Sequence, residues 1–260
     1  MAERLALEAH LRAQRDSGRK LLVPYVTGGL GADWAEVVRA CAAAGADAIE
    51  VGIPFSDPVM DGPTIQAASE AALAQGTNLD KILDELRGLD AGVPIVAMTY
   101  VNLVFHKGYQ RFAAEAVAAG VGGVILPDLP LEEIGEWEPH ALDAGLETVL
   151  LASPLTPDDR LPVLCARSKG YIYGVNLLGV TGERAALSDA SVVLAKRLKA
   201  ATDLPVIRGV GISTADQART VAEHAAGVIE LGDQDVGVVQ VGAALACCAR
   251  HSHAPRDTLH

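Results

Sequence analysis

Short runs rich in Val, Ile and Leu recur along this chain, and most are followed by a longer segment with helical patterning. The runs lack polar alternation, which is typical of parallel strands that are buried on both faces. An eighth run lies somewhere between Gly227 and Val241. The other seven are Leu21–Thr27, Ala48–Val51, Pro94–Met98, Gly123–Leu126, Glu147–Leu151, Gly170–Val175 and Pro205–Arg208.

The number of strand-helix units predicts the fold class. Helical patterns between the runs include Trp34–Ala44, Tyr109–Ala119 and Thr214–Glu223. Eight units in 260 residues favour a closed (β/α)8 (TIM) barrel, which typically has roughly 250 residues. A doubly wound open sheet is the alternative α/β fold.

The ends of the chain are expected to differ from the repeating units. An extra N-terminal helix at Glu3–Arg15 precedes the first strand and could close that end of the barrel. Residues 1–250 are expected to form a single catalytic domain, because no linker divides them. The polar residues 251–260 are expected to be a disordered tail.

Composition excludes several classes of function. The formal net charge of -12 argues against nucleic acid or an anionic membrane surface as a partner. No apolar run reaches the roughly 18–20 residues of a membrane span, and the charged segment Met1–Lys20 does not resemble a signal peptide. We therefore expect a cytoplasmic protein. The cysteines show no metal-ligand spacing and are interpreted as reduced thiols; they are Cys41, Cys165, Cys247 and Cys248.

One acidic residue, Glu50, interrupts the apolar run Ala48–Val51. Active groups of TIM barrels collect at the carboxyl ends of the strands and in the loops that follow. A carboxylate that points into the barrel is costly to bury, so its pKa rises and it can exchange protons near neutral pH. The alternative is a structural ion pair. Arg208 is then the one plausible partner, since no predicted strand carries a lysine.

The loop after this strand, residues 52–63, contains Asp57 and Asp61. Each aspartate is followed by proline or glycine. Taken alone, both are therefore better interpreted as turn or helix-capping residues than as catalytic ones.

Glycine-rich segments follow the later strands. Gly179–Gly182 and Gly209–Ser213 follow the sixth and seventh runs, and Gly242 with Ala243 opens the last predicted helix. Glycines let backbone N–H groups approach a phosphate, and TIM barrels often bind phosphate after strands seven and eight. Successive turns of this kind predict a phosphate site. They do not predict a dinucleotide site, because the third glycine of that fingerprint is missing.

Longer blocks of sequence give a family resemblance. The block Glu50–Gln66, which contains Ile-Pro-Phe-Ser-Asp-Pro-Val-Met-Asp-Gly-Pro, resembles the alpha subunits of tryptophan synthase. The resemblance runs from about Leu22 to Ser213. Supporting blocks are Val23–Thr27, Met98–Phe105, Leu126–Pro130, Gly179–Gly182 and Gly209–Ser213.

This resemblance implies a carbon-carbon lyase that needs no metal or organic cofactor. Members split indole-3-glycerol phosphate into indole and glyceraldehyde 3-phosphate by a retro-aldol reaction. The matching positions imply that Glu50 is the acid and base at indole C3 and the adjacent hydroxyl. Asp61 would hold and polarise the indole N–H. The implied substrate-binding residues are Tyr25, Tyr100, Leu126, Tyr173, Gly182, Gly211, Gly242 and Ala243.

The resemblance also implies a partner, a pyridoxal-phosphate beta subunit that consumes indole. Asp57 and Pro58 match the segment that contacts it. Two alternatives stay open: a stand-alone lyase of a specialised pathway, and a weakly active paralogue that mainly binds a partner.

Two departures from the family pattern concern phosphate binding. Ala243 stands where the family usually has serine, so one hydroxyl donor is lost, and Asn176 stands where serine is common. Gly232 and Asp233 are rivals of Gly242 and Ala243 for the position at the phosphate, where an aspartate would repel the ligand.

Overall fold

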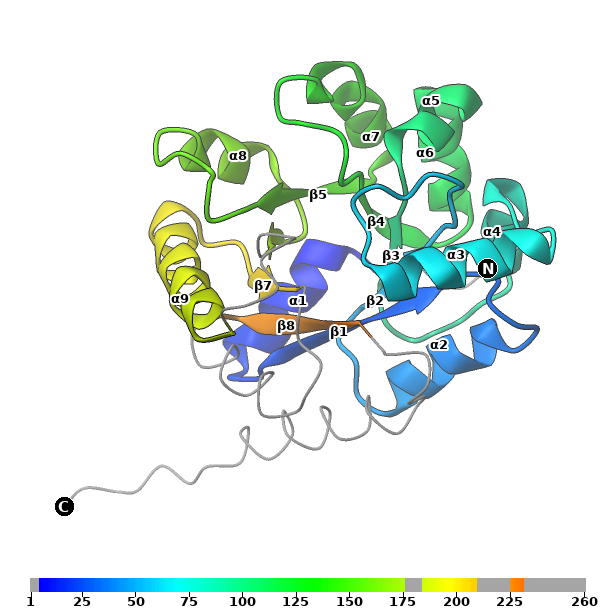
Figure 1. Cartoon of the computed structure of the whole chain (residues 1–260), viewed down its shortest axis with the longest axis horizontal. Coiled ribbons are helices and arrows are strands. Elements are labelled where there is room, and N and C mark those ends of the chain that lie inside the picture. Colours follow the sequence, from blue (N-terminus) through cyan, green and yellow to red (C-terminus); the bar gives the residue numbers. More distant parts are fainter. Residues whose placement is uncertain (1–4, 176–183, 210–224, 232–260) are drawn as a thin grey trace.

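Parallel strands form a closed barrel in the computed structural model, which describes residues 5–175, 184–209 and 225–231. Each strand pairs with its neighbours in chain order, and β8 pairs with β1 (Figure 1). The expected TIM barrel is therefore confirmed, and the doubly wound alternative is wrong. The strands are β1 (Leu21–Thr27), β2 (Ile49–Gly52), β3 (Ile95–Met98), β4 (Val121–Ile125), β5 (Glu147–Ala152), β6 (Ile172–Gly174), β7 (Val206–Arg208) and β8 (Gly227–Leu231).

Helices surround the strands in Figure 1. The predicted helices at Trp34–Ala44 and Tyr109–Ala119 end one residue earlier than expected, while Thr214–Glu223 and the tail lie outside the described residues. The helices after β1 are α2 (Trp34–Ala43), α3 (Pro63–Ala74), α4 (Leu79–Leu86), α5 (Val101–Lys107), α6 (Tyr109–Ala118), the 3-10 helix η1 (Ile134–Glu136), α7 (Glu138–Ala144), α8 (Leu161–Arg167) and α9 (Arg184–Ala201).

Alternate residues of the strands build two separate apolar cores. Ile49 and Val51 of β2 belong to the outer core, between the sheet and the helices. Successive side chains of a strand point to opposite faces, so Glu50 faces the interior of the barrel. The interior core includes Leu21, Val23, Ala48, Val96, Ile125, Val149, Tyr171, Tyr173 and Ile207.

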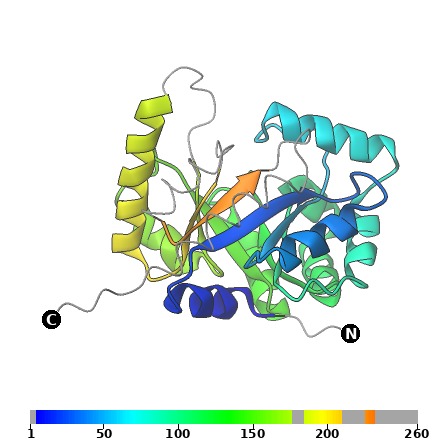
Figure 2. The same cartoon turned by 90° about the horizontal axis from the view of Figure 1, so that it is seen from below.

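The first helix, α1 (Leu7–Asp16), lies across the end of the barrel where the strands begin (Figure 2). Leu7 and Leu11 are fully buried in the interior core. Gly123 makes room for this packing, because a Cβ there would lie 2.5 Å from a Leu7 methyl group and 3.2 Å from the Glu147 carbonyl oxygen. The Glu8 N–H donates to Glu147 Oε2 at 2.8 Å. The expected closing helix is therefore confirmed, and the opposite end of the barrel stays available for a site.

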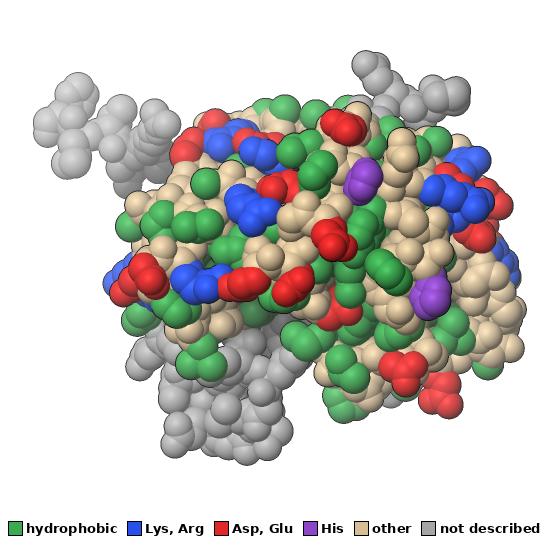
Figure 3. Space-filling view, turned by 90° about the horizontal axis from the view of Figure 1, so that it is seen from above, with side chains coloured by type: hydrophobic (Ala, Val, Ile, Leu, Met, Phe, Trp, Pro, Cys, Tyr) green, Lys and Arg blue, Asp and Glu red, His purple; other side chains and the backbone are tan. Residues whose placement is uncertain are grey.

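Basic and acidic side chains are interspersed on the face shown in Figure 3. Ion pairs of the described residues include Arg167 with Glu138 and Lys107 with Glu115. Among the helices that the structure describes, none is long and apolar enough to cross a membrane.

Candidate functional site

Glu50 is fully buried in the barrel interior, with no exposed surface. The hydroxyl of Tyr171 donates to Glu50 Oε1 at 2.5 Å, and within the described residues Oε2 has no hydrogen-bond partner. Burial raises the pKa of Glu50 to about 8 because the anion loses its water, and the Tyr171 hydrogen bond offsets part of this rise. The expected burial and raised pKa are confirmed. At neutral pH the side chain is mainly the neutral acid.

The proposed ion pair between Glu50 and Arg208 is wrong. Ile207 belongs to the interior core, so Arg208, the next residue of β7, faces the helices. The packing around Gly174 of β6 agrees with this. A Cβ added to Gly174 would lie 3.0 Å from Arg208 Cδ and 3.6 Å from a methyl group of Leu198 in α9. Arg208 and Glu50 therefore lie on opposite faces of the barrel wall.

Tyr171 is a site residue that the sequence interpretation missed. It lies just before β6, two residues from Tyr173, and both rings belong to the interior core. Their centroids are 6.4 Å apart. The period of two in Gly170–Val175 was the available signal, because it places Tyr171 on the same face as Tyr173.

Asp61 lies in the loop between β2 and α3, and the backbone there forms a turn. Its N–H donates to the Pro58 carbonyl at 3.0 Å, and its carbonyl accepts from Gln66 Nε2 at 2.9 Å. Its carboxylate has a separate role, because Oδ2 accepts a hydrogen bond from the Tyr100 hydroxyl at 2.9 Å. Burial raises the pKa of Asp61, and the Tyr100 hydrogen bond opposes the rise.

Two tyrosines, Tyr25 and Tyr173, lie near both carboxylates. Burial, together with the negative charges of Glu50 and Asp61, raises the pKa of both Tyr25 and Tyr173. Each phenol therefore lies within electrostatic reach of both carboxylates. Gly52 makes room for Tyr25, since any side chain at Gly52 would overlap the Tyr25 hydroxyl. Together, these residues form one polar site in the barrel interior, at the carboxyl ends of β1, β2 and β6.

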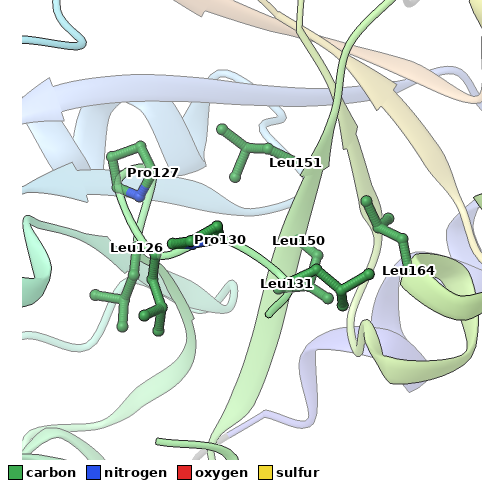
Figure 4. Close-up of a pocket in the computed structure, with 8 residues that line it drawn as sticks. Leu126, Pro127, Pro130, Leu131, Leu150, Leu151 and Leu164 are labelled. Atoms are coloured by element: carbon green, nitrogen blue, oxygen red, sulfur yellow. The ribbon is translucent and has the colours of Figure 1, made fainter. Parts of the chain in front are cut away.

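Leu126 does not join this site in the structure. Its side chain packs in the outer core, whereas the preceding residue, Ile125, belongs to the interior core. Leu126 lines an apolar cavity of about 120 Å³ beside β5 and α8 (Figure 4). The cavity is lined by leucine and proline alone, so it offers no side chain for acid-base chemistry.

The remaining predicted residues divide into two groups. Asp57 and Pro58 are described and lie in the loop before Asp61, where Asp57 is exposed and accepts a hydrogen bond from Ser56. The predicted phosphate-binding residues lie outside the described residues, as do Asn176 and Gly232 with Asp233; they are Gly182, Gly211, Gly242 and Ala243. In the described ranges, no three His, Cys, Asp or Glu side chains gather in a way that could hold a metal ion.

Comparisons with known proteins point to one family. The family model described as "Tryptophan synthase alpha chain" matches residues 11–244. The tryptophan synthase alpha chain of Xanthomonas axonopodis pv. citri is 45% identical over 227 residues, which is 85% of this chain and 84% of that protein. The alpha chain of Methanosarcina acetivorans is 43% identical over 206 residues, 79% of this chain and 75% of that protein.

Solved structures give the same result. A tryptophan synthase structure from Mycobacterium tuberculosis has a TM-score of 0.86 and 33% identity, and the match covers 97% of this chain and 100% of that one. Tryptophan synthase subunit alpha from Legionella pneumophila has a TM-score of 0.85 and 30% identity, over 94% of this chain and 98% of that one.

The buried Glu50 predicts a pH-dependent stability. Below pH 4.5 the group is protonated in both the folded and the unfolded chain, so its contribution to stability is fully present. As the pH rises from 4.5, only the unfolded chain ionises. The contribution is therefore lost progressively until the folded protein also ionises near pH 8. We expect Glu50→Gln to lack this loss and to gain a few kcal/mol relative to wild type between these limits, at about 1.4 kcal/mol per pKa unit.

Urea unfolding at pH 5 and pH 8 measures this difference. Glu70→Gln, on an exposed position of α3, is the matched control and should keep the wild-type pH dependence. If Glu50→Gln also keeps the wild-type pH dependence of stability, the pKa of Glu50 is not raised in the folded protein.

Proposed function

This chain belongs to the tryptophan synthase alpha chain family, and we propose that Glu50 and Asp61 carry out the reaction of that family in its barrel. An alpha chain of this family is a carbon-carbon lyase of tryptophan biosynthesis. The proposed reaction cleaves indole-3-glycerol phosphate into indole and glyceraldehyde 3-phosphate. The observation that carries the assignment of residues is the pKa of Glu50, which is about 8 in a site that also contains a second carboxylate.

In the first proposed step, the neutral Glu50 acid transfers its proton to indole C3. The C2–C3 double bond supplies the electron pair of the new C–H bond, and the positive charge that forms is shared with the ring nitrogen. Asp61, as a carboxylate, accepts a hydrogen bond from the indole N–H and stabilises this charge. Glu50 is left as a carboxylate.

In the second step, the Glu50 carboxylate removes the proton of the side-chain hydroxyl next to C3. The oxygen forms the aldehyde carbonyl as the C–C bond to C3 breaks. The electron pair of that bond restores the C2–C3 double bond and the neutral nitrogen. The products are indole and glyceraldehyde 3-phosphate, and Glu50 is protonated again. A pKa near neutrality suits a group that must first donate and then accept a proton.

The surroundings of the carboxylates support this proposal. Tyr171 holds Glu50 by its Oε1 and leaves Oε2 free of described partners, so one oxygen is available for the substrate. We assign Tyr25, Tyr100 and Tyr173 to the walls around the indole. For the phosphate we propose the backbone N–H groups at Gly182, Gly211, Gly242 and Ala243.

We also propose a tryptophan synthase beta chain as the partner. The loop Asp57–Met60 precedes Asp61 directly, and it presents apolar side chains to solvent: Val59 is 78% exposed and Met60 is 41% exposed. Phe105 of α5, the helix that follows Tyr100, is 62% exposed. Exposed apolar side chains next to an active site favour a protein partner at the mouth of the barrel, which would receive the released indole.

Turnover of two variants tests the chemistry. We expect Glu50→Gln to lower kcat about 10²–10⁴-fold, because the amide keeps the size of the side chain and cannot shuttle a proton. Asp61→Asn should also lower kcat strongly, since it removes the charge opposite the indole nitrogen. The measurement is release of indole from indole-3-glycerol phosphate by the purified chain, with Glu70→Gln as the control. Near-wild-type turnover by folded Glu50→Gln would refute the assignment.

Titration with a beta chain from the same genome tests the partner. Val59→Ser and Asp57→Ala should weaken binding and beta-dependent activation more than basal turnover. Val193→Ser changes a similarly exposed valine on α9 and should leave binding unchanged. If no binding occurs with wild type, the stand-alone lyase becomes the better assignment.

A further inference from the structure

Asp61 is connected to Asp128 through two adjacent residues, Tyr100 and Val101. Asp128 follows β4, and its Oδ1 accepts a hydrogen bond from the backbone N–H of Val101, the first residue of α5, at 2.9 Å. The residue before Val101 is Tyr100, whose hydroxyl donates to Asp61 Oδ2. The side chains of two distant loops therefore bind adjacent residues, Asp61 to the Tyr100 hydroxyl and Asp128 to the Val101 N–H.

The backbone around Tyr100 is held from the side of β4. The N–H groups of both of its neighbours donate there: Thr99 to the Ile125 carbonyl at 3.1 Å, and Val101 to the Asp128 carboxylate. Tyr100 is the N-cap residue of α5, but its side chain makes no capping hydrogen bond. Asp128 supplies the acceptor that the start of this helix lacks.

The ring of Tyr100 then holds the loop that carries Asp61. The ring stacks on Phe55 near the start of the loop, with centroids 5.1 Å apart. Near the end of the loop, the Tyr100 hydroxyl accepts from the Met60 N–H at 2.9 Å and donates to the Asp61 carboxylate. Tyr100 itself is only 5% exposed. A displacement of its backbone would therefore move the Asp61 carboxylate.

We propose that Asp128 is a positioning residue for the lyase reaction, which holds the Asp61 carboxylate in place through the start of α5 and Tyr100. This inference rests on the proposed function. Asp128 acts in it as a hydrogen-bond acceptor for one peptide N–H, and Tyr100 transmits the position to the indole-binding carboxylate.

The kcat values of two Asp128 variants show whether its hydrogen-bond acceptor or its charge matters. Asp128→Ala loses both, and we expect kcat to fall about tenfold or more, as for the loss of a hydrogen bond to a charged group. Asp128→Asn keeps an oxygen acceptor and should stay near wild type. Asp90→Ala is the matched control, because Asp90 also accepts a backbone N–H, from Gly92, in an exposed loop between α4 and β3.

A titration of the Asp61 carboxyl by carbon-13 NMR gives a second measurement that needs no turnover. Asp61 faces Tyr100, Tyr25 and Tyr173, and Asp128 faces Tyr100. The Tyr100 hydrogen bond lowers the pKa of Asp61, so its loss in Tyr100→Phe should raise that pKa.

Asp128→Ala should raise the Asp61 pKa in the same direction, and the double variant should raise it no further than Tyr100→Phe alone. Asp128→Asn should leave it unchanged. Equal effects of alanine and asparagine, an Asp61 pKa that does not move in Asp128→Ala, or additive effects in the double variant would each overturn the proposal.

Two further outcomes, a variant that does not fold and a wild-type chain without activity, can be told apart from failure of the proposal. If Asp128→Ala does not fold, Asp128→Glu takes its place: it keeps the charge, moves the acceptor by one methylene, and must raise the Asp61 pKa if the proposal holds. If the wild-type chain releases no indole, the proposed function fails, while the NMR titration still decides whether Asp128 positions Asp61.

Discussion

The burial of Glu50 inside the barrel is the constraint on which the rest of the site depends. β2 pairs with β1 on one side and with β3 on the other, so its register is fixed from both edges. A shift by one residue would turn Ile49 and Val51 into the interior and Glu50 toward the helices. The fold thus holds a carboxyl group away from water, with no described cation contributing to its pKa. The neutral acid becomes its stable form.

The second carboxylate meets the opposite requirement. In the proposed reaction, Asp61 must be an anion to stabilise positive charge on the indole nitrogen, and it lies on a loop where burial is only partial. The Tyr100 hydroxyl favours the ionised form by donating to it. One fold therefore places two carboxyl groups in different environments: burial is complete at Glu50 and partial at Asp61, where the Tyr100 hydrogen bond opposes the rise in pKa. The proposed reaction assigns the proton transfer at C3 to the fully buried group and the hydrogen bond with the indole N–H to the partly buried one.

The period of two in a strand explains much of what the sequence could predict. It places Glu50 inward from the apolar neighbours Ile49 and Val51, and the same rule would have excluded Arg208 as its partner. The prediction of Leu126 as a substrate-binding residue rested on a matched motif block alone. Such a block does not say which of two adjacent residues faces inward, and here it is Ile125 that does.

The sequence patterns could not predict the contacts between loops. The hydrogen bonds from Tyr100 to Asp61 and from Val101 to Asp128 join segments that are 27 or more residues apart. Their geometry depends on how loops from different strands meet at the end of the barrel, and no periodicity or spacing encodes it. Family resemblance predicted Tyr100 as a site residue, while the structure shows what its hydroxyl contacts.

Direct titration of the Glu50 carboxyl tests the central claim, that this group holds a proton at neutral pH. In carbon-13 NMR spectra of the labelled wild-type chain, the carboxyl signal assigned through Glu50→Gln should titrate near pH 8. The midpoint should move to still higher pH in Tyr171→Phe, because the hydrogen bond that stabilises the carboxylate is lost. A midpoint near 4.5, the ordinary value for glutamate, would contradict the account.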